Sequence, residues 1–256
     1  MKREFILGYP VDALTMEEAL LWIKEQVKNK DSKIIAVINA NKLWLANKDE
    51  RIASFLKSAD LIIPEYSIVW GAKRLGVPLT HIGGITLLKA FLPFAERESI
   101  RAYFLGAKIQ VIENLIHKLR NNYPLLSIAG YHHGYLSNDQ MVKGVLVDIR
   151  EKKPDIIFIA IGSPKQEMLM CDIKKMNIVP IMMGVGGSFD VLSEDKKDAR
   201  SWARSKGLEW LYRIFQDPLN FKYWKRYLIT NTYFIYLVFA AKYFRNKNIQ
   251  EKSSRA

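Results

Sequence analysis

Short apolar runs alternate with longer segments of helical periodicity over the first 195 residues of the chain. The apolar runs do not alternate with polar residues, as the residues of a half-exposed strand would. Strands that are apolar on both faces are typical of a parallel sheet with helices on each side. The pattern therefore predicts an α/β fold with a mostly parallel sheet that is covered on both faces.

The expected helices and strands follow one another along this region. Thr15 and Glu18 have the spacing of a capping box, which predicts the start of the first helix. Further helices are expected over 41–59, from near Ser67, after Gly84, over 108–122, over 138–151 and just before the last strand. The expected strands are residues 33–39, 60–65, 100–106, 127–134, 155–162 and 178–187.

A polar stretch at 193–201 marks a change in composition. Residues 196–256 contain 14 Lys and Arg against 4 Asp and Glu, whereas the rest of the chain contains 25 against 22. Fourteen of the 30 aromatic residues lie within 202–244. We therefore predict a core over 1–195 and a basic, aromatic helical appendage over 196–256 that binds an anionic surface.

Residues 227–244 are apolar for most of their 18 positions, but they include Thr230, Asn231, Thr232 and Lys242. A helix that lies in a membrane interface suits this composition better than a spanning helix, which remains an alternative. The charges of the appendage are interleaved with bulky aliphatic residues. This mixture suits lipid better than a nucleic-acid backbone, so we expect no nucleic-acid partner.

Composition and motifs exclude several classes of site. One cysteine, Cys171, allows neither a disulfide framework nor a cysteine metal cluster. The N-terminal apolar run is too short for a signal peptide, which predicts synthesis in the cytosol. The glycine fingerprints of dinucleotide and P-loop sites are absent, which argues against a nicotinamide-dependent oxidoreductase. Neighbouring His132 and His133 should point to opposite faces of a strand, so we expect no metal site there.

Polar residues follow four of the expected strands. Asn39 and Glu65 end the first two, and the segments 163–167 and 185–190 follow the last two. In open parallel sheets, ligands bind beyond the carboxyl ends of the strands. Backbone N–H groups near Gly162 and Gly186 could approach a phosphate closely. Asn39 and Glu65 could instead be ordinary helix caps, and the glycines could be simple turns.

Three motifs together resemble those of the WecG/TagA/CpsF glycosyltransferase family. They are a P-K-Q-E box at 164–167, a G-V-G-x-x-F-D box at 184–190 and a G-L-E-W-x-x-R box at 207–213. Weaker agreement extends over most of the chain. The resemblance implies a Rossmann-like core with a C-terminal membrane-targeting appendage. It also implies transfer of a sugar, typically N-acetylmannosamine, from a UDP-sugar to a polyprenyl-diphosphate-linked saccharide on the inner face of the cell membrane.

The resemblance assigns expected roles residue by residue. The expected catalytic residues are Glu65, Asn39, Gln166 and Arg213, with Glu65 at the position of the catalytic base. The expected nucleotide-sugar contacts are Gly162, Lys165, Gly186, Asp190 and His81. Lys222, Lys225 and Arg226 are expected at the diphosphate or the membrane. No metal or other cofactor is expected, and the family behaviour is compatible with a homo-oligomer.

The chain departs from the family pattern at four places. Val37 replaces a threonine, Pro64-Glu65-Tyr66 replaces P-D-G, His81 replaces an arginine, and Asp198-Ala199-Arg200 replaces R-A-P. The first three lie where the sugar and the acceptor are expected, whereas the nucleotide side keeps its motifs. The departures predict a related reaction with a changed sugar or acceptor. The alternative is a UDP-sugar-binding relative that has lost catalysis.

Overall fold

Six parallel strands form the central sheet, in the order β4-β3-β8-β7-β5-β6. The structure, a computed structural model, describes residues 2–194 and 221–253. The sheet strands are β3 (Lys33–Ile38), β4 (Leu61–Pro64), β5 (Ala102–Gly106), β6 (Ile128–His132), β7 (Ile156–Ala160) and β8 (Ile181–Gly184). Every pairing within this sheet is parallel, which confirms the fold class predicted from the unalternating apolar runs.

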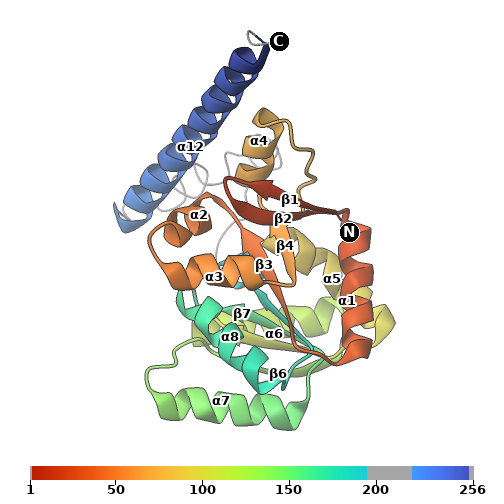
Figure 1. The fold of residues 1–256 in the computed structure, drawn as a ribbon. Coiled ribbons are helices and arrows are strands. Elements are labelled where there is room, and N and C mark those ends of the chain that lie inside the picture. The colour runs from red at the N-terminus through yellow and green to blue at the C-terminus, as the bar shows by residue number, and fades with distance from the viewer. Residues whose placement is uncertain (1, 195–220, 254–256) are drawn as a thin grey trace.

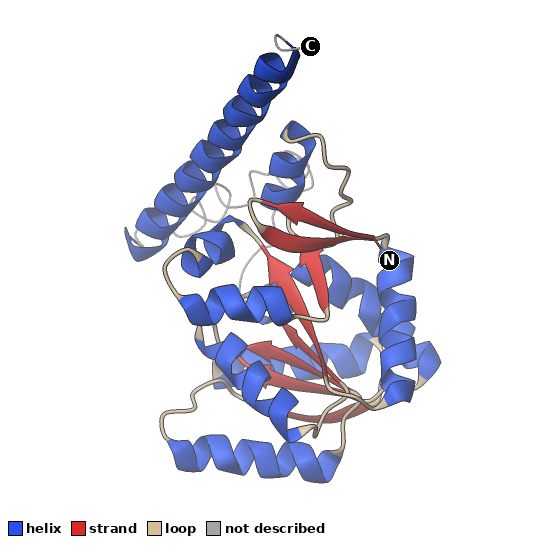
Figure 2. Ribbon diagram, viewed as in Figure 1, coloured by secondary structure: helices blue, strands red, loops and turns tan. Residues whose placement is uncertain are grey.

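Helices cover both faces of the sheet (Figures 1 and 2). The helices are α1 (Met16–Asn29), α2 (Ala40–Ala46), α3 (Glu50–Ser58), α4 (Tyr66–Arg74), α5 (Gly84–Glu98), α6 (Ile109–Asn122), α7 (Asp139–Lys152), α8 (Lys165–Met176), α9 (Ser188–Leu192) and α12 (Phe221–Ser253). One apolar cluster joins the sheet to α2, α3, α7 and α8. A second joins the opposite face to α1, α5, α6 and α9.

Two features differ from the sequence expectations. An antiparallel hairpin of β1 (Lys2–Ile6) and β2 (Tyr9–Ala13) precedes the first helix, where no strand was predicted. Its two-residue turn places Leu7 and Gly8 at positive φ, and only the glycine is a usual residue for such a turn. The prediction of a single helix over 41–59 was also wrong. A break after Ala46 separates α2 from a second helix, α3, which Asp49 caps.

The hairpin is joined to the sheet through Asp12, which is buried. Its carboxylate accepts two hydrogen bonds from Arg3, at 2.7 and 2.9 Å. It also accepts the backbone N–H of Ile62 in the edge strand β4, at 2.7 Å. The carboxylate thus satisfies an edge N–H group that has no strand partner, and its own charge is balanced by Arg3.

The long C-terminal helix α12 packs against α2 and α4 (Figure 1). Phe234 and Val238 are buried in the same apolar cluster as the sheet. Gly71 on α4 makes this approach feasible, because a Cβ atom there would lie 2.7 Å from the Phe234 ring. Of the helices within 2–194 and 221–253, none is both long enough and apolar enough to span a membrane. The division into a core and an appendage at residue 195 stays a prediction.

We predict that Asp12→Ala lowers the free energy of unfolding by about 1–3 kcal/mol, because it leaves a buried N–H without an acceptor and Arg3 without its partner. Chemical denaturation of the full chain measures this change. Lys2→Ala is the matched control, since its ion pair with Glu4 on the same hairpin is largely exposed and should contribute under about 1 kcal/mol. Equal effects of the two substitutions would contradict the role of Asp12.

Candidate active site

The carboxyl ends of the six strands lie on one edge of the sheet, because all six run in the same direction. β8 lies between β3 and β7 in the sheet. The chain leaves β3 and β7 toward α2 and α8 on one face, and it leaves β8 toward α9 on the other. In open parallel sheets, ligands bind where neighbouring connections diverge in this way, and the predicted site residues follow these strands and the neighbouring β4.

Glu65 directly follows β4 and stands at the N-cap position of α4, but its side chain does not cap that helix. Its Oε1 instead accepts the backbone N–H of Gly84 at 3.0 Å, at the start of α5. Its Oε2 lies 3.7 Å from Nε2 of His81. The carboxylate is therefore turned away from its own helix and toward the loop that precedes α5.

Asn39 is a helix cap, one of the two roles its sequence position allowed. Its side-chain oxygen accepts the backbone N–H of Lys42 at 2.8 Å and so caps α2. The cap uses the oxygen, whereas the amide nitrogen carries the donors with which a ligand could be recognised. Capping and ligand binding are thus compatible at this residue.

A buried ion pair connects the first turns of α2 and α8. Lys42 and Glu167 are both buried, and their side chains are directly bonded. Glu167 also accepts hydrogen bonds from the Ser163 hydroxyl at 2.9 Å and from the Gln166 side-chain amide at 3.0 Å. The pair thereby links the loops after β3 and β7, and it holds one member of the predicted catalytic set.

Two opposing effects set the pKa of Glu167. Burial by itself raises this pKa, because it penalises the charged carboxylate. The charge of Lys42 and the hydrogen bonds from Lys42, Ser163 and Gln166 together outweigh burial, so the pKa of Glu167 lies below its ordinary value. The carboxylate is therefore ionised at neutral pH and acts as a fixed acceptor.

Gln166 lies in the first turn of α8 and is buried beneath the end of β8. A Cβ atom on Gly184 would lie 2.7 Å from the Gln166 amide nitrogen, so a larger residue there would displace the end of the Gln166 side chain. The Gln166 carbonyl oxygen is buried and has no hydrogen-bond partner among the described residues. An unsatisfied acceptor of this kind is what a ligand hydroxyl or amide would complete.

The two glycine turns have the open geometry that phosphate binding requires. Gly162 follows β7 with φ of 81°, and Gly186 follows β8 with φ of 52°. Apart from the chain neighbours, none of the described residues has an atom within 4 Å of a Cβ built at either glycine, so a ligand could approach these backbones closely. Lys165 is exposed in the next turn, and Asp190 is half-buried on α9.

The basic residues predicted at the diphosphate fall mostly beyond what the structure describes. Arg213 lies outside the described residues, and so do the side chains of Lys222 and Lys225. Arg226 is exposed on α12, with its guanidinium 5.2 Å from the centre of the Tyr227 ring. Their roles stay predictions.

Three of the four departures from the family pattern lie around Glu65. The ring of Tyr66 is stacked on the ring of His81, with their centroids 3.4 Å apart. A Cβ atom built on Gly84 would lie 3.3 Å from Val37 and 3.7 Å from Glu65. The substitutions therefore form one contiguous group instead of three independent changes.

Sequence reasoning missed Lys42 and Ser163 and gave Glu167 no role. One signal was available, namely a lysine and a glutamate in the first turns of helices that follow buried strands. A second expectation was wrong: the rings of His132 and His133 do not point apart, but lie 4.3 Å between centroids. The reason is that β6 ends at His132, so the alternation of a strand no longer applies.

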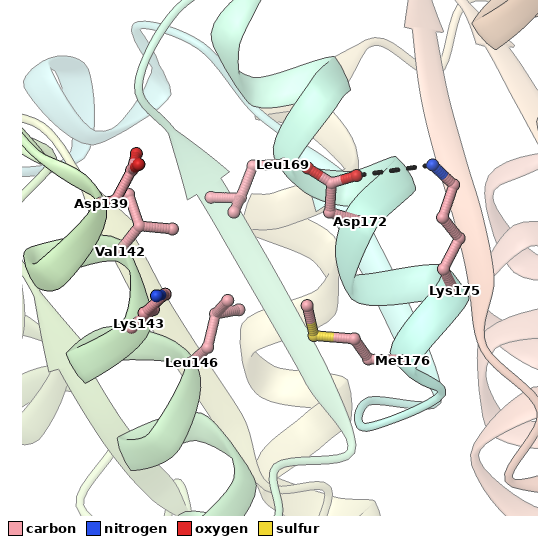
Figure 3. A pocket seen from close by; sticks show the side chains of 8 residues that line it. All are labelled: Asp139, Val142, Lys143, Leu146, Leu169, Asp172, Lys175 and Met176. Atoms are coloured by element: carbon pink, nitrogen blue, oxygen red, sulfur yellow. Dashed lines mark ion pairs between the residues drawn. The ribbon is translucent and has the colours of Figure 1, made fainter.

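A metal site, and a groove away from the strand ends, are weaker candidates for a functional site. No group of three or more His, Cys, Asp or Glu side chains suited to a metal ion occurs within the described part of the chain. A groove of about 370 Å³ lies between α7 and α8 (Figure 3), lined by residues such as Val142, Leu146, Leu169 and Met176. The groove lies on a face of the sheet that helices cover. Its Asp172–Lys175 ion pair, at 3.6 Å, joins two residues of α8 and does not cross the groove.

The sequence is similar to proteins of one glycosyltransferase family. A family model described as "Glycosyl transferase WecG/TagA/CpsF family" matches residues 5–248. A Bacillus subtilis (strain 168) protein is 31% identical over 207 residues, which are 80% of this chain and 78% of that protein. A Staphylococcus aureus (strain MW2) protein is 32% identical over 225 residues, or 86% and 85% of the two chains. Both are named N-acetylglucosaminyldiphosphoundecaprenol N-acetyl-beta-D-mannosaminyltransferase.

We predict that Lys42→Met destabilises the protein by about 3–5 kcal/mol at pH 7, because it leaves the buried Glu167 carboxylate without its counter-charge. Denaturant unfolding checks this value. The double variant Lys42→Met/Glu167→Gln should be less destabilised than Lys42→Met alone, since no unpaired charge remains.

The same pair predicts a pH dependence. The pKa of Glu167 is lower in the folded than in the unfolded chain, so its stabilisation is present above about pH 4.5 and is lost as the pH falls through the folded value. The stability difference between wild type and Glu167→Gln should therefore shrink below about pH 4.5. Unfolding curves between pH 3 and 7 measure it, and a constant difference would contradict the pairing.

Proposed function

This chain belongs to the WecG/TagA/CpsF family of glycosyltransferases, and we propose that it moves N-acetylmannosamine or another hexose from a UDP-sugar to a polyprenyl-diphosphate-linked saccharide. The names of the relatives support this acceptor, since they specify N-acetylglucosaminyl-diphosphoundecaprenol. The single observation that carries the proposal is the placement of Glu65, whose carboxylate is held by the Gly84 N–H at the strand-end edge.

The proposed chemistry is one displacement that inverts the anomeric carbon. Glu65 removes the proton of the acceptor hydroxyl, the hydroxyl oxygen attacks the anomeric carbon, and the bond to the UDP oxygen breaks with its electron pair. General-base catalysis of this kind contributes roughly 10²–10⁴-fold. Asn39 and Gln166 would contact the sugar through their amide groups, beside the free acceptor of Gln166.

The diphosphate gains charge as it leaves, and preorganised cations and N–H donors are the usual means of stabilising it. We propose that Lys165, Arg213 and the basic residues of α12 supply the positive charge in place of a metal ion. The turns at Gly162 and Gly186 would supply backbone N–H groups, and Asp190 would hold the nucleoside. His81 remains a candidate sugar contact.

Helix α12 supports a location on the inner face of the membrane. Its face opposite Phe234 and Val238 exposes large apolar residues, namely Trp224, Leu228, Ile229, Ile235, Tyr236, Phe239 and Tyr243. We call this set, which extends along α12 from Trp224 to Tyr243, the exposed face of α12. Such a face, together with flanking Lys and Arg, is suited to an anionic membrane interface.

The reaction is tested by mass spectrometry of a turnover assay with the full chain, anionic vesicles, a lipid-diphosphate-linked amino sugar and a panel of UDP-sugars. We expect a product heavier by one N-acetylhexosamine or hexose, at a rate that a chelator does not change. If UDP stabilises the protein but no product forms, the chain is a UDP-sugar-binding relative and the proposal fails.

Glu65→Gln should lower the transfer rate by about 10²–10⁴-fold while UDP still stabilises the protein. The loss follows from removal of the base with little change in shape. Glu113→Gln, at an exposed position of α6, is the matched control and should leave the rate unchanged. Full activity of Glu65→Gln would exclude Glu65 as the base.

Replacement of Leu228, Tyr236 and Tyr243 by serine should abolish sedimentation with anionic vesicles and leave the fold intact, because all three are exposed. Truncation after Ser193 should also abolish binding, but it removes Phe234 and Val238 from the apolar cluster, so the triple variant is the sharper test. Leu125→Ser is the control, since Leu125 is 80% exposed but lies between α6 and β6, far along the chain from α12. Undiminished vesicle binding by the triple variant would show that this face is not the anchor.

A further inference from the structure

His81 contacts the side chain on which the proposed reaction depends. Its Nε2 lies 3.7 Å from Oε2 of Glu65, and the other carboxylate oxygen accepts the Gly84 N–H at 3.0 Å. This Nε2 is buried and has no hydrogen-bond partner among the described residues. A hydrogen bond between an N–H group and an oxygen requires about 2.7–3.2 Å, so a closure of about 0.5–1 Å would form one. Catalytic hydrogen bonds are commonly long before substrate binds.

The His81 ring is held in place from several sides. Tyr66 stacks on it with an angle of 11° between the ring planes. The N–H groups of Ile82 and Gly83 both donate to the carbonyl of Pro64, which ties the loop to the residue before Glu65. A Cβ atom on Gly83 would lie 2.6 Å from His81 Nε2 and 3.1 Å from Glu65 Oε2, so only glycine leaves the two groups facing each other.

We propose that His81 is a positioning residue for Glu65, donating Nε2–H to Oε2 while the Gly84 N–H holds Oε1. This role rests on the proposed function, in which Glu65 is the base. With both oxygens held, the remaining lone pairs of the carboxylate have fixed directions, and one of them can accept the proton of the acceptor hydroxyl. The proton that leaves the hydroxyl goes to Glu65, and His81 keeps its own proton throughout. Two titratable side chains of the described residues lie against His81, namely Glu65 and Tyr66.

The physical reason for this arrangement is the length of the glutamate side chain. A glutamate has one more rotatable bond than an aspartate, and a base misplaced by about 1 Å can cost on the order of 10²-fold in rate. The Gly84 N–H holds one oxygen of this longer side chain, Oε1. A donor on Oε2 would further restrict the orientation of the carboxylate.

Two substitutions separate the donor from the ring stack. His81→Phe keeps a ring on Tyr66 but has no N–H, and it should lower kcat by about 10–100-fold with little change in KM. His81→Gln loses the stack but retains an amide N–H, and it should keep kcat within several-fold of wild type. In the Glu65→Gln background, His81→Phe should cause no further loss, because the two residues act as one unit.

Wild-type kcat in His81→Phe, an equal loss in both His81 variants, or additive losses with Glu65→Gln would each overturn the proposal. Absence of any transfer by the wild type would instead overturn the proposed function. The geometry is then still tested by nitrogen-15 NMR of the four histidine rings, with His81 assigned from the His81→Gln spectrum. We expect the His81 proton on Nε2 at neutral pH and a change in its ring signals in Glu65→Gln. A neutral ring with its proton on Nδ1, or signals unaffected by Glu65→Gln, would show that His81 does not donate to Glu65.

Discussion

The buried ion pair of Lys42 and Glu167 is the interaction on which the arrangement of the strand ends depends. Neither charge is tolerable in the interior without the other, so α2 and α8 must begin at positions that bring the two side chains together. Asn39 caps α2 through the backbone of Lys42, and Glu167 accepts hydrogen bonds from Ser163 and Gln166. The loops after β3 and β7 are thereby held as one polar unit across the end of β8.

The geometry of the site around Glu65 has a different basis. Here the contacts are longer and the groups are half-buried, with backbone N–H groups and a stacked pair of rings in place of a buried charge pair. Val37, Tyr66 and His81 lie in this region and depart from the family pattern together. Glu65 is longer than the aspartate of the family pattern, and His81 is shorter than the arginine. The longer carboxylate side chain can therefore compensate for the shorter nitrogen-bearing side chain beside it. The turns at Gly162 and Gly186, where we propose that the diphosphate binds, have no such substitutions.

Helix α12 shows how one element can belong to two environments. Phe234 and Val238 are part of the apolar cluster that also contains the sheet, whereas the opposite side of the helix exposes aromatic and aliphatic residues. A helix that is apolar on nearly all sides cannot be assigned a buried face from periodicity, because the pattern has no clear polar side. At Gly71 of α4 the side that carries Phe234 and Val238 packs closely, since a Cβ atom there would lie 2.7 Å from the Phe234 ring and 3.0 Å from Val238.

The fold class, and the edge of the sheet at which the candidate site lies, follow from the sequence alone. Apolar runs without polar alternation, such as 33–38 and 156–160, form strands whose two faces are both buried. The polar residues that follow such runs lie at the carboxyl ends of the parallel strands. The tertiary structure alone decided which side chains meet. The pairing of Lys42 with Glu167, and the contact of His81 with Glu65, join residues 125 and 16 positions apart in the chain, as the residue numbers show. Such contacts depend on strand order and loop conformation, and no local pattern of residues specifies them. The hairpin at the N-terminus was missed for a related reason: its strands are stabilised by Asp12 reaching β4, a contact about 50 residues away.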